Sequence, residues 1–592
     1  MNLARRLATL GRAPLPEWQE LALATARPGR AARWFADHFL LCLALPYLVL
    51  LVGVFAGIPL LALAGWLLGA VLDWAATRAD SPLARIAETA GATPALRAAL
   101  RSLLVVWVIG PPAAAGYVAV VAVIQAVWLG LTGLAAGFSR SAPPLRYLPG
   151  SATQPAPLTG YTRFYRRAAG TPLAFVLAEL SALAGAVLMA FGSAIGAAVL
   201  LAVALLIAIG YAVPAASGFL RLLRRADADA AALLAEVAAD QPRYLVHVSL
   251  GAGQSRYIAN QWLPVLDATP TPGLIAVREA SQLAPLRQTR VPVVYAPSPR
   301  NLEQVTLPSV TVGLYLAYGE KNAHLLRDPA LKHVMLLHGD SDKATSFNAQ
   351  ARGFDQVWVA GQAAVDRYRA AGVALRPEQV VLVGRPQVEP LLNLPPRDPS
   401  LPPVVLYAPT FEGYYAETGH SSLDTMGVAM VRRLLAEFPQ VQVWFKPHPA
   451  SGVLRPSMLA AVAEIEDLLR GGPHVLVDRR PELTLTDCLA RADVLISDIS
   501  SVVSDYLATG RPVLVTNPSG LDEAEFRAQY PSQRGSYVVD PDLAGFHQAM
   551  ADALGPDPLR AERHAVVTYL LGDLPQGPQA AFDAALARLA SA

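Results

Sequence analysis

The first third of the chain consists of long apolar blocks separated by short hydrophilic segments. Residues 39–72 and 102–138 contain no Asp, Glu, Lys or Arg, and residues 171–219 contain a single acid, Glu179. A helix that crosses a membrane needs about 20 apolar residues. The third block is therefore long enough for two membrane spans, whereas each of the first two fits either one long tilted helix or a tight hairpin.

The charge of the hydrophilic segments favours hairpins. Every segment next to an apolar block is rich in arginine, and basic loops of membrane proteins stay on the cytoplasmic side. Only an even number of crossings per block puts all of these segments on one side. We therefore expect six spans as three hairpins, with both termini inside, and four spans as the alternative count. Gly57 and Pro59 suit a turn in the first block, whereas Pro111 and Pro112 lie early in the second.

The overall composition agrees with a membrane-associated chain. Of the 592 residues, 53% are hydrophobic and 16% are charged, against about 45–50% and about 25% in soluble domains. The first apolar run is too long for the core of a cleavable signal peptide. Cys42 and Cys488 lie in different regions, so we expect neither a disulfide nor a cysteine metal site. The net charge of +2 gives no argument for nucleic-acid binding.

The second half of the chain has the pattern of a parallel α/β fold. From Tyr244 onward, short β-branched or apolar runs alternate with helical stretches, which argues for parallel strands with crossover helices. A proline-rich stretch at residues 390–403 can form neither a helix nor a central strand, and it is predicted to be a linker. The predicted strands are residues 244–248, 273–277, 292–295, 334–337, 356–359 and 380–383 before the linker, and residues 404–407, 441–445, 475–477, 494–496 and 512–515 after it.

These elements predict an α-helical transmembrane domain followed by two doubly wound α/β domains. Two such domains joined by a linker place two sets of strand ends across one cleft. The expected segments are a cytoplasmic N-terminal segment at residues 1–37, a transmembrane helical domain at 38–220, a connecting helix at 221–240, a first α/β domain at 241–392, the linker at 393–403, a second α/β domain at 404–545, and C-terminal helices at 546–592.

Three polar motifs follow predicted strands, and ligands of open α/β folds bind beyond the carboxyl ends of strands. The first motif is His-Gly-Asp-Ser-Asp-Lys at residues 338–343. His338 is a candidate general base, since imidazole titrates near neutral pH; the alternative is a capping loop with a hydrogen-bonded histidine. Asp340, Ser341 and Asp342 could each cap a helix that starts near Lys343. Two aspartates at this place count against an anion site there.

The second motif is Lys-Pro-His-Pro at residues 446–449, directly after a predicted strand. Its two prolines stiffen the loop and hold Lys446 and His448 in fixed directions. A rigid cation beside a histidine suits the negative charge that develops on a phosphoryl oxygen. The alternative is a turn whose prolines only stop the strand.

The third motif is Asp-Ile-Ser-Ser at residues 498–501, between a predicted strand and a predicted helix. Ser500 or Ser501 is a natural N-cap residue. The free backbone N–H groups and the dipole of a helix N-terminus attract anions. Plain capping and phosphate binding are compatible at such a position.

Together these motifs resemble the CDP-glycerol glycerophosphotransferase family, enzymes of teichoic-acid-type polymer synthesis. The family shows His-Gly-Thr-x-x-Lys, Tyr-Ala-Pro-Thr, Lys-Pro-His-Pro and Asp-x-Ser-Ser motifs, and its Gly-x-Pro-Arg is similar to Gly-Arg-Pro-Gln here. Order and spacing agree across roughly residues 330–516. The corresponding segments of this chain are residues 338–343, 407–410, 446–449, 498–501 and 384–387.

The resemblance implies a GT-B fold, in which two Rossmann-like domains hold a nucleotide-diphosphate donor in their cleft. The first domain, residues 241–392, would lie on the acceptor side, and the second, residues 404–545, on the nucleotide-donor side. It implies that His338 deprotonates an acceptor hydroxyl, which attacks the phosphorus bearing glycerol while CMP leaves, and that neither a metal nor a cofactor is required. An acid in place of the family threonine, at Asp340, would repel the donor's phosphate or bind a different acceptor. The implied site consists of His338 and His448 as catalytic residues, Lys343, Lys446, Ser500 and Ser501 around the donor phosphates, and Asp340, Thr410 and Asp498 in supporting positions.

We therefore expect a membrane-anchored transferase that moves glycerol phosphate, or a related alcohol phosphate, from a CDP-linked donor to a hydroxyl of a lipid-linked or cell-surface glycopolymer. Its catalytic domains would lie at the cytoplasmic face of the inner cell membrane. The alternatives are a GT-B nucleotide-sugar glycosyltransferase and a non-enzymatic membrane transport or sensor protein with a nucleotide-binding domain. Expected partners are CDP-glycerol or a related nucleotide donor, a lipid-linked glycopolymer acceptor and membrane lipids, but no nucleic acid; the sequence does not fix the oligomeric state.

Overall fold

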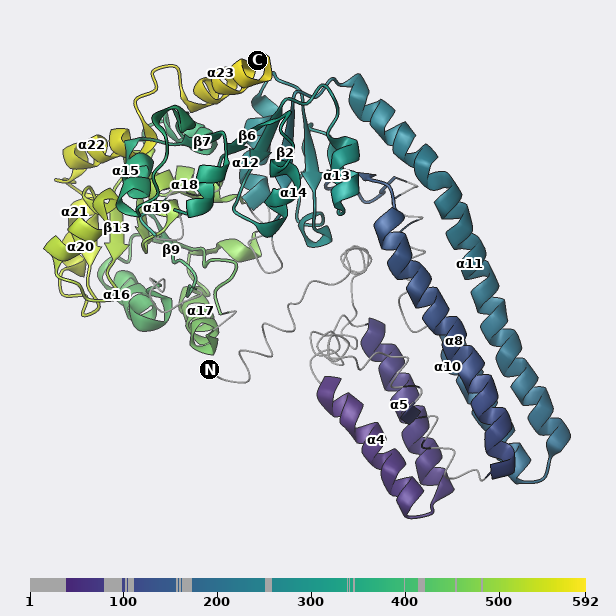
Figure 1. The fold of residues 1–592 in the computed structure, drawn as a ribbon. Helices are drawn as coiled ribbons and strands as arrows, with labels where there is room; N and C mark the ends of the chain where they lie inside the picture. The colour runs from purple at the N-terminus through teal and green to yellow at the C-terminus, as the bar shows by residue number, and fades with distance from the viewer. Residues whose placement is uncertain are drawn as a thin grey trace.

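The computed structural model shows a bundle of long helices and two α/β domains (Figure 1). It describes residues 39–78, 98, 100, 101, 104, 111–155, 158, 161, 173–250, 258–337, 339, 341–343, 347–398, 400–413, 421–452, 455–480 and 483–591.

The helical bundle contains two hairpins among its described residues. Helices α4 (Phe39–Phe55) and α5 (Pro59–Arg78) form the first hairpin, and α10 (Leu173–Ala190) and α11 (Ala194–Ala239) form the second. The first turn is where the sequence places it. Gly57 has φ of 68°, which glycine adopts without strain, and Pro59 begins α5, a position where its missing N–H costs nothing.

The second apolar block can be compared with its prediction only in part, because residues 102, 103 and 105–110 lie outside the described residues. The block forms one continuous helix, α8, over its described stretch Pro111–Ser141, and no turn interrupts it there. Pro111 and Pro112 begin this helix rather than break one, since proline is tolerated in the first turn. The predicted connecting helix is likewise no separate element, because α11 runs unbroken from the third block to Ala239. Both hairpin turns and the start of α8 lie at the end of the bundle remote from the α/β domains (Figure 1).

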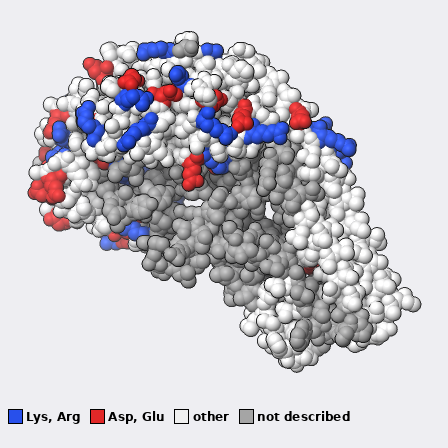
Figure 2. Space-filling model, in the orientation of Figure 1, with Lys and Arg blue, Asp and Glu red and all other residues white. Residues whose placement is uncertain are grey.

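Helix length alone does not support six membrane spans. Among the described residues, α11 is the one helix that is long and apolar enough to cross a membrane; the other apolar helical stretches, Leu45–Phe55, Leu60–Val71, Ala115–Leu131 and Ala174–Ala190, are shorter. The bundle nevertheless carries an apolar surface. Phe55, Phe191 and Ile195 are 83–85% exposed, and in Figure 2 charged side chains gather over the α/β domains, while the described lower part of the bundle shows none on this face.

The first α/β domain is built on an eight-stranded sheet in the order β1-β4-β3-β2-β5-β6-β7-β8. From β4 to β7 all neighbours are parallel, and their order is that of a Rossmann sheet, 3-2-1-4-5-6. β1 joins antiparallel at the edge from the segment between two apolar helices. The strands are β1 (Leu145–Tyr147), β2 (Tyr244–Val248), β3 (Gly273–Val277), β4 (Val293–Tyr295), β5 (Val312–Tyr315), β6 (Lys332–Met335), β7 (Gln356–Val359) and β8 (Val380–Leu382).

Short helices flank this sheet and bury a core of aliphatic and aromatic side chains. They are α12 (Ile258–Ala268), α13 (Pro299–Val305), α14 (Ala323–Leu326) and α15 (Gln362–Ala370). All six predicted strands of this domain are present within one or two residues of their expected bounds. β1 and β5 were not predicted.

The second α/β domain repeats the same topology. Its six parallel strands follow the order β11-β10-β9-β12-β13-β14, again 3-2-1-4-5-6. All five predicted strands are present, and β14 was missed. The strands are β9 (Val404–Ala408), β10 (Gln442–Phe445), β11 (Val475–Leu476), β12 (Val494–Ser497), β13 (Val513–Thr516) and β14 (Tyr537–Val539); the helices are α16 (Val428–Glu437), α17 (Pro456–Leu469), α18 (Leu485–Arg491), α19 (Ser501–Leu507), α20 (Glu523–Gln529) and α21 (Phe546–Leu554).

The last two helices, α22 (Arg560–Leu571) and α23 (Pro578–Ser591), carry the chain back to the first domain. The ring of Phe582 in α23 lies 5.8 Å from that of Trp262 and 5.4 Å from that of Trp358, centroid to centroid, inside the first core. The two domains are therefore joined by two crossings of the chain. This arrangement is the predicted pair of Rossmann-like domains.

Candidate functional site

The two domains meet at the carboxyl ends of their sheets, where the three polar motifs lie. A Cβ added to Gly339, which follows β6, would stand 2.9 Å from the Oγ of Ser501 at the start of α19. Only glycine permits so close an approach of the backbone. The first and third motifs, 162 residues apart in the sequence, are thus in contact. His338 and Asp340 lie outside the described residues.

Lys343 reaches from the first domain into the second. Its Nζ donates a hydrogen bond of 2.8 Å to Oγ1 of Thr410, and it lies 5.8 Å from the ring centroid of Phe411. Burial lowers the pKa of Lys343 to about 8, although the nearby carboxylate of Asp498 acts in the opposite direction. The junction of the two domains therefore holds a part-buried amino group whose pKa is well below that of an ordinary lysine.

His448 approaches the same aromatic ring. Its imidazole lies 5.1 Å from the ring of Phe411, centroid to centroid. Its Nδ1 accepts a hydrogen bond of 3.1 Å from the backbone N–H of Ala450. A neutral imidazole that accepts at Nδ1 carries its proton on Nε2. Lys343, Thr410 and His448, three of the predicted site residues, are thus brought together around Phe411.

Asp498 lies next to this cluster and is hydrogen-bonded to Thr410. It is fully buried and accepts hydrogen bonds from the backbone N–H of Thr410 (2.7 Å), from that of Ser422 (3.2 Å) and from the hydroxyl of Thr516 (2.6 Å). Burial raises the pKa of Asp498, while these donors favour the carboxylate. The carboxylate fixes the loop that carries Thr410 and the ring of Phe411, so it acts through its neighbours.

Ser500 is the N-cap residue of α19, but its side chain makes no capping hydrogen bond. Its Oγ lies 3.3 Å from the Oγ of Ser497, whose hydroxyl donates to the carbonyl of Ala408. Plain side-chain capping, the alternative raised by the sequence, is therefore not what this serine does. Ser501 is the first residue of the helix and contacts Gly339 as described.

Lys446, the remaining predicted phosphate ligand, has a different neighbour. Its Nζ lies 3.6 Å from Oδ1 of the half-exposed Asp478, and its backbone N–H donates to the carbonyl of Tyr407 (2.9 Å). The charge of Lys446 is therefore partly compensated by the carboxylate of a half-exposed residue of the second domain.

The structure gives Asp342 partners other than the helix start considered from the sequence, and residues 344–346 of that start lie outside the described residues. Its carboxylate pairs with Nε of Arg367 at 2.7 Å and accepts hydrogen bonds from the backbone N–H (3.0 Å) and the hydroxyl (2.7 Å) of Ser532. Because Ser532 belongs to the second domain, Asp342 joins the two domains. Arg367 and Ser532 are far from Asp342 in the sequence, so a local sequence pattern could not predict these contacts.

A second buried ion pair reinforces the junction. Arg385 of the Gly-Arg-Pro-Gln segment pairs with Asp505 in α19, and its Nη2 lies 3.1 Å from Oδ2 of that residue. Both side chains are less than 10% exposed. A buried bidentate pair fixes geometry as well as distance.

Sequence reasoning missed two residues that shape the site. The buried carboxylate of Glu412 accepts hydrogen bonds from the backbone N–H groups of Gly452 (3.1 Å) and Arg455 (3.2 Å), which holds the loop that follows His448. Leu337 has φ of 59°, a strained value for leucine. Glu412 is marked in the sequence by its place after Ala-Pro-Thr, whereas no sequence signal marks Leu337.

Among the described residues, no three His, Cys, Asp or Glu side chains lie close enough together to hold a metal ion.

Residues 378–538 match the family model described as CDP-glycerol:poly(glycerophosphate) glycerophosphotransferase. The resemblance predicted from the motifs, and with it a CDP-glycerol glycerophosphotransferase-like enzyme, is confirmed over these residues. The match covers the second sheet up to Val538 in β14, the segment with Arg385, and the second and third motifs, whereas the first motif lies outside it. No curated protein matches the chain.

Solved structures of low sequence identity are similar to part of this chain. The wall teichoic acid polymerase TagF is 14% identical, and its match covers 60% of this chain and 90% of that one with a TM-score of 0.41. A UDP-forming α,α-trehalose-phosphate synthase from Burkholderia vietnamiensis is 14% identical (59% and 98% covered, TM-score 0.35), and a UDP-GlcNAc 2-epimerase from Neisseria meningitidis is 11% identical (59% and 99%, TM-score 0.37). Likenesses of this strength say nothing about the reaction.

Proposed function

We propose that this chain, whose residues 378–538 match the glycerophosphotransferase family model, transfers glycerol phosphate from CDP-glycerol to a hydroxyl group and releases CMP. The observation that carries the proposal is the cluster of Lys343, Thr410 and His448 around Phe411, at the junction of the two sheets. A cation, a hydroxyl and an imidazole are the groups that a pyrophosphate needs, and they lie where ligands of such folds bind.

Each residue has a distinct part in the proposed reaction. The ammonium of Lys343 pairs with the pyrophosphate oxygens, and the Nε2–H of His448 donates to an oxygen between the phosphorus atoms. Ser500 and Ser501 bind the phosphates from the start of α19, and Lys446 adds positive charge at the rim. Because phosphoryl transfer depends mostly on positioning and on neutralising charge, these groups suffice without acting as nucleophiles.

The chemical step is an in-line displacement at phosphorus. The acceptor oxygen forms a bond to the phosphorus that bears glycerol, and the bond from that phosphorus to the CMP oxygen breaks. His338 takes the proton of the acceptor hydroxyl as general base, and CMP leaves with its charge compensated by Lys343.

The proposed enzyme is anchored in the inner cell membrane through the helical bundle, with a lipid-linked acceptor and both α/β domains on the cytoplasmic side. The support is physical: large side chains such as Phe55, Phe191 and Ile195 are exposed on the bundle, and surfaces of this kind on soluble monomers are small. α11 is also followed after four residues by β2, so the proposed anchor and the first α/β domain are adjacent in the chain. Retention of the full chain in membranes washed with alkaline carbonate is the expected outcome, and release into the wash would contradict the anchoring.

The reaction is tested with the full-length protein in detergent. CMP release is measured with CDP-glycerol, other CDP-alcohols, and UDP- and GDP-sugars, in the presence of lipid-linked acceptors. We expect CMP from CDP-glycerol and a loss of at least a hundredfold in His448→Ala, because general acid–base groups contribute about 10²–10⁴-fold. The matched control is His564→Ala on the exposed face of α22. Turnover of nucleotide sugars without any CMP release would replace this proposal with a glycosyltransferase.

A further inference from the structure

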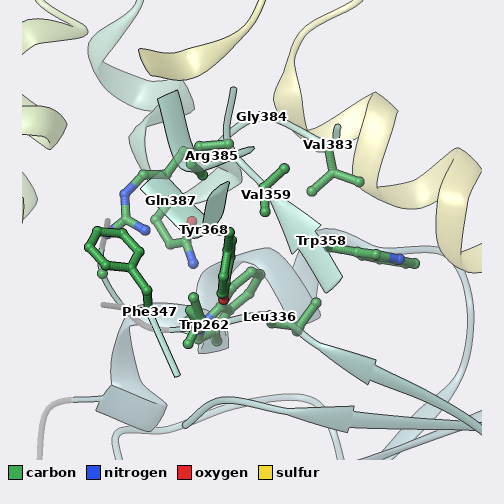
Figure 3. A pocket seen from close by; sticks show the side chains of 14 residues that line it. Trp262, Leu336, Phe347, Trp358, Val359, Tyr368, Val383, Gly384, Arg385 and Gln387 are labelled. Atoms are coloured by element: carbon green, nitrogen blue, oxygen red, sulfur yellow. The ribbon is translucent and has the colours of Figure 1, made fainter. Parts of the chain in front are cut away.

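A cavity opens in the first domain at the carboxyl ends of β6, β7 and β8 (Figure 3). Its walls are unusually aromatic for so small a space. Trp262 of α12, Phe347, Trp358 of β7 and Tyr368 of α15 all line it, together with Gln387 of the turn Pro386–Leu391. Such a combination of apolar faces with one or two polar groups is typical of small-molecule sites.

The cavity lies beside the proposed catalytic centre. Leu337 and Gly339, the two chain neighbours of His338, both line it, and Gly339 is the residue that contacts Ser501 of the second domain. The indole N–H of Trp262 donates to the carbonyl of Leu337 (2.9 Å), which holds the strained backbone at this point. A ligand in the cavity would therefore be presented to the junction where the donor phosphates are proposed to lie.

Gln387 is the residue that indicates what the cavity binds. The nitrogen and the oxygen of its side-chain amide are both buried, and neither has a hydrogen-bond partner in the described part of the structure. In Figure 3 this side chain points toward Phe347 and Tyr368. A buried polar group without a partner destabilises the fold, and an amide with both of its groups unpaired suits a ligand that both donates and accepts.

The other polar side chains of the cavity wall already have partners. The hydroxyl of Tyr368 pairs with that of Tyr318 (2.7 Å), the indole N–H of Trp358 donates to Gln356 (2.8 Å), and Arg385 is paired with Asp505. The described wall therefore offers no uncompensated cation to a phosphate. Its chemistry favours an uncharged ligand with an apolar face.

We propose that this cavity is the acceptor site and that it binds a neutral pyranose ring, with neighbouring hydroxyls of the sugar hydrogen-bonded to the amide of Gln387. Sugar rings present C–H faces that pack on aromatic side chains, while their hydroxyl edges need donors and acceptors together. The proposal rests on the transferase function proposed above and narrows it. The chain adds glycerol phosphate to a sugar hydroxyl, and the charged end of a glycerol phosphate polymer is not its acceptor.

The test compares acceptors with the full-length detergent-solubilised protein and CDP-glycerol. The probes are octyl β-glycosides of neutral hexoses and N-acetylhexosamines, and an octyl-linked glycerol phosphate dimer. We expect CMP release and product formation with at least one glycoside and none with the dimer. Gln387→Met keeps the length of the side chain but removes both hydrogen-bonding groups, so it should raise the KM for the glycoside about tenfold and leave the KM for CDP-glycerol unchanged. Gln350→Met, an exposed glutamine outside the cavity, is the matched control.

Phe347→Leu is the second variant, and it carries the test if Gln387→Met does not fold. It removes one aromatic face and should also raise the KM for the glycoside alone. CMP release with the glycerol phosphate dimer but with no glycoside would overturn this inference and leave the transferase function standing. An unchanged KM for the glycoside in both variants would overturn it as well. No CMP with any acceptor would instead refute the proposed function itself.

Discussion

Lys343 offers the sharpest test of the proposed site, because its charge should lower the stability of the fold while it contributes to binding of the donor. The lysine is buried at the domain junction, and its pKa falls from the usual 10.5 to about 8. The folded state therefore destabilises the ammonium form of Lys343 compared with the same form in the unfolded chain, whereas it does not destabilise the neutral amine. Replacing this residue by methionine, which has a similar length, removes a charge that the fold does not need.

The magnitude follows from the pKa. At about 1.4 kcal/mol per pH unit, the buried charge costs the folded state about 3 kcal/mol at any pH below 8. The lost hydrogen bond to Thr410 offsets about 1 kcal/mol of this, so Lys343→Met should stabilise the protein by about 2 kcal/mol at pH 7. Since the unfolded chain binds the extra proton, the cost fades as the pH rises from 8 to 10.5, and the gain should fade with it.

Thermal unfolding at pH 7 and pH 10 measures the predicted gain in stability, and titration with CDP-glycerol measures the predicted loss of donor binding. We expect the melting temperature of Lys343→Met to rise by about 4–8 °C at pH 7, if this domain behaves like others of its size, and donor binding to be lost. Lys332→Met, which removes an exposed lysine, should change neither. A variant that melts lower than the parent and still binds CDP-glycerol normally would refute a role for this ammonium in the donor site.

Three further expectations follow from the same geometry. The kcat/KM for CDP-glycerol should fall as the pH rises above about 8, because neutral Lys343 attracts no phosphate. In Lys343→Arg, whose side chain stays charged, this decrease at high pH should disappear. Asp342→Ala leaves the buried Arg367 without its carboxylate and should lower stability to denaturant by about 3–5 kcal/mol, a loss that the added change Arg367→Met should partly reverse. Glu412→Gln places an amide N–H against a backbone N–H of the loop after His448, so kcat should fall about 10–100-fold while melting temperature changes little; equal kcat would contradict the positioning role.

Most strands of the α/β domains could be predicted, because buried parallel strands read as short apolar runs. Those that were missed have physical reasons. β5 contains Gly313, and a glycine inside a strand weakens the strand pattern. β14 has three residues between the turn-forming Gly535 and Pro541, so its sequence resembles a loop. β1 is an edge strand of three residues that follows Pro143 and Pro144, and it pairs antiparallel with β4 from a loop between apolar helices. Its membership of the sheet depends on contacts about 150 residues away in the sequence.

The sequence predicted which residues belong to the candidate site, but not how they are arranged in space. The motifs identified Lys343 and His448, but a sequence cannot show that both reach Phe411, because the lysine comes from the first domain and the ring from the second. The same holds for Asp498. Its place after β12 was visible in the sequence, whereas its three donors come from strands and loops up to 88 residues away. A role that depends on burial and on distant partners follows from the fold and not from the local pattern.

The helical bundle was predicted less well, since hydropathy measures the length of an apolar block but not where it turns. Arginine-rich segments suggested a hairpin in every block. The second block is continuous over Pro111–Ser141, because two prolines at a helix start are compatible with a long helix and carry no information about a turn further on. The start of α8 lies at the same remote end of the bundle as the two hairpin turns (Figure 1).

The acids of the first motif look unfavourable for a phosphate site, and the structure removes part of that objection. The charge of Asp342 is compensated by the guanidinium of Arg367 at 2.7 Å and by two donors of Ser532, and the carboxylate is only 4% exposed. A carboxylate neutralised in this way repels a nearby phosphate far less than a free one. Its next neighbour in the chain, Lys343, keeps its own direction toward Thr410. The acid in the motif therefore joins the two domains, and the neighbouring Lys343 lies beside Thr410 of the second domain.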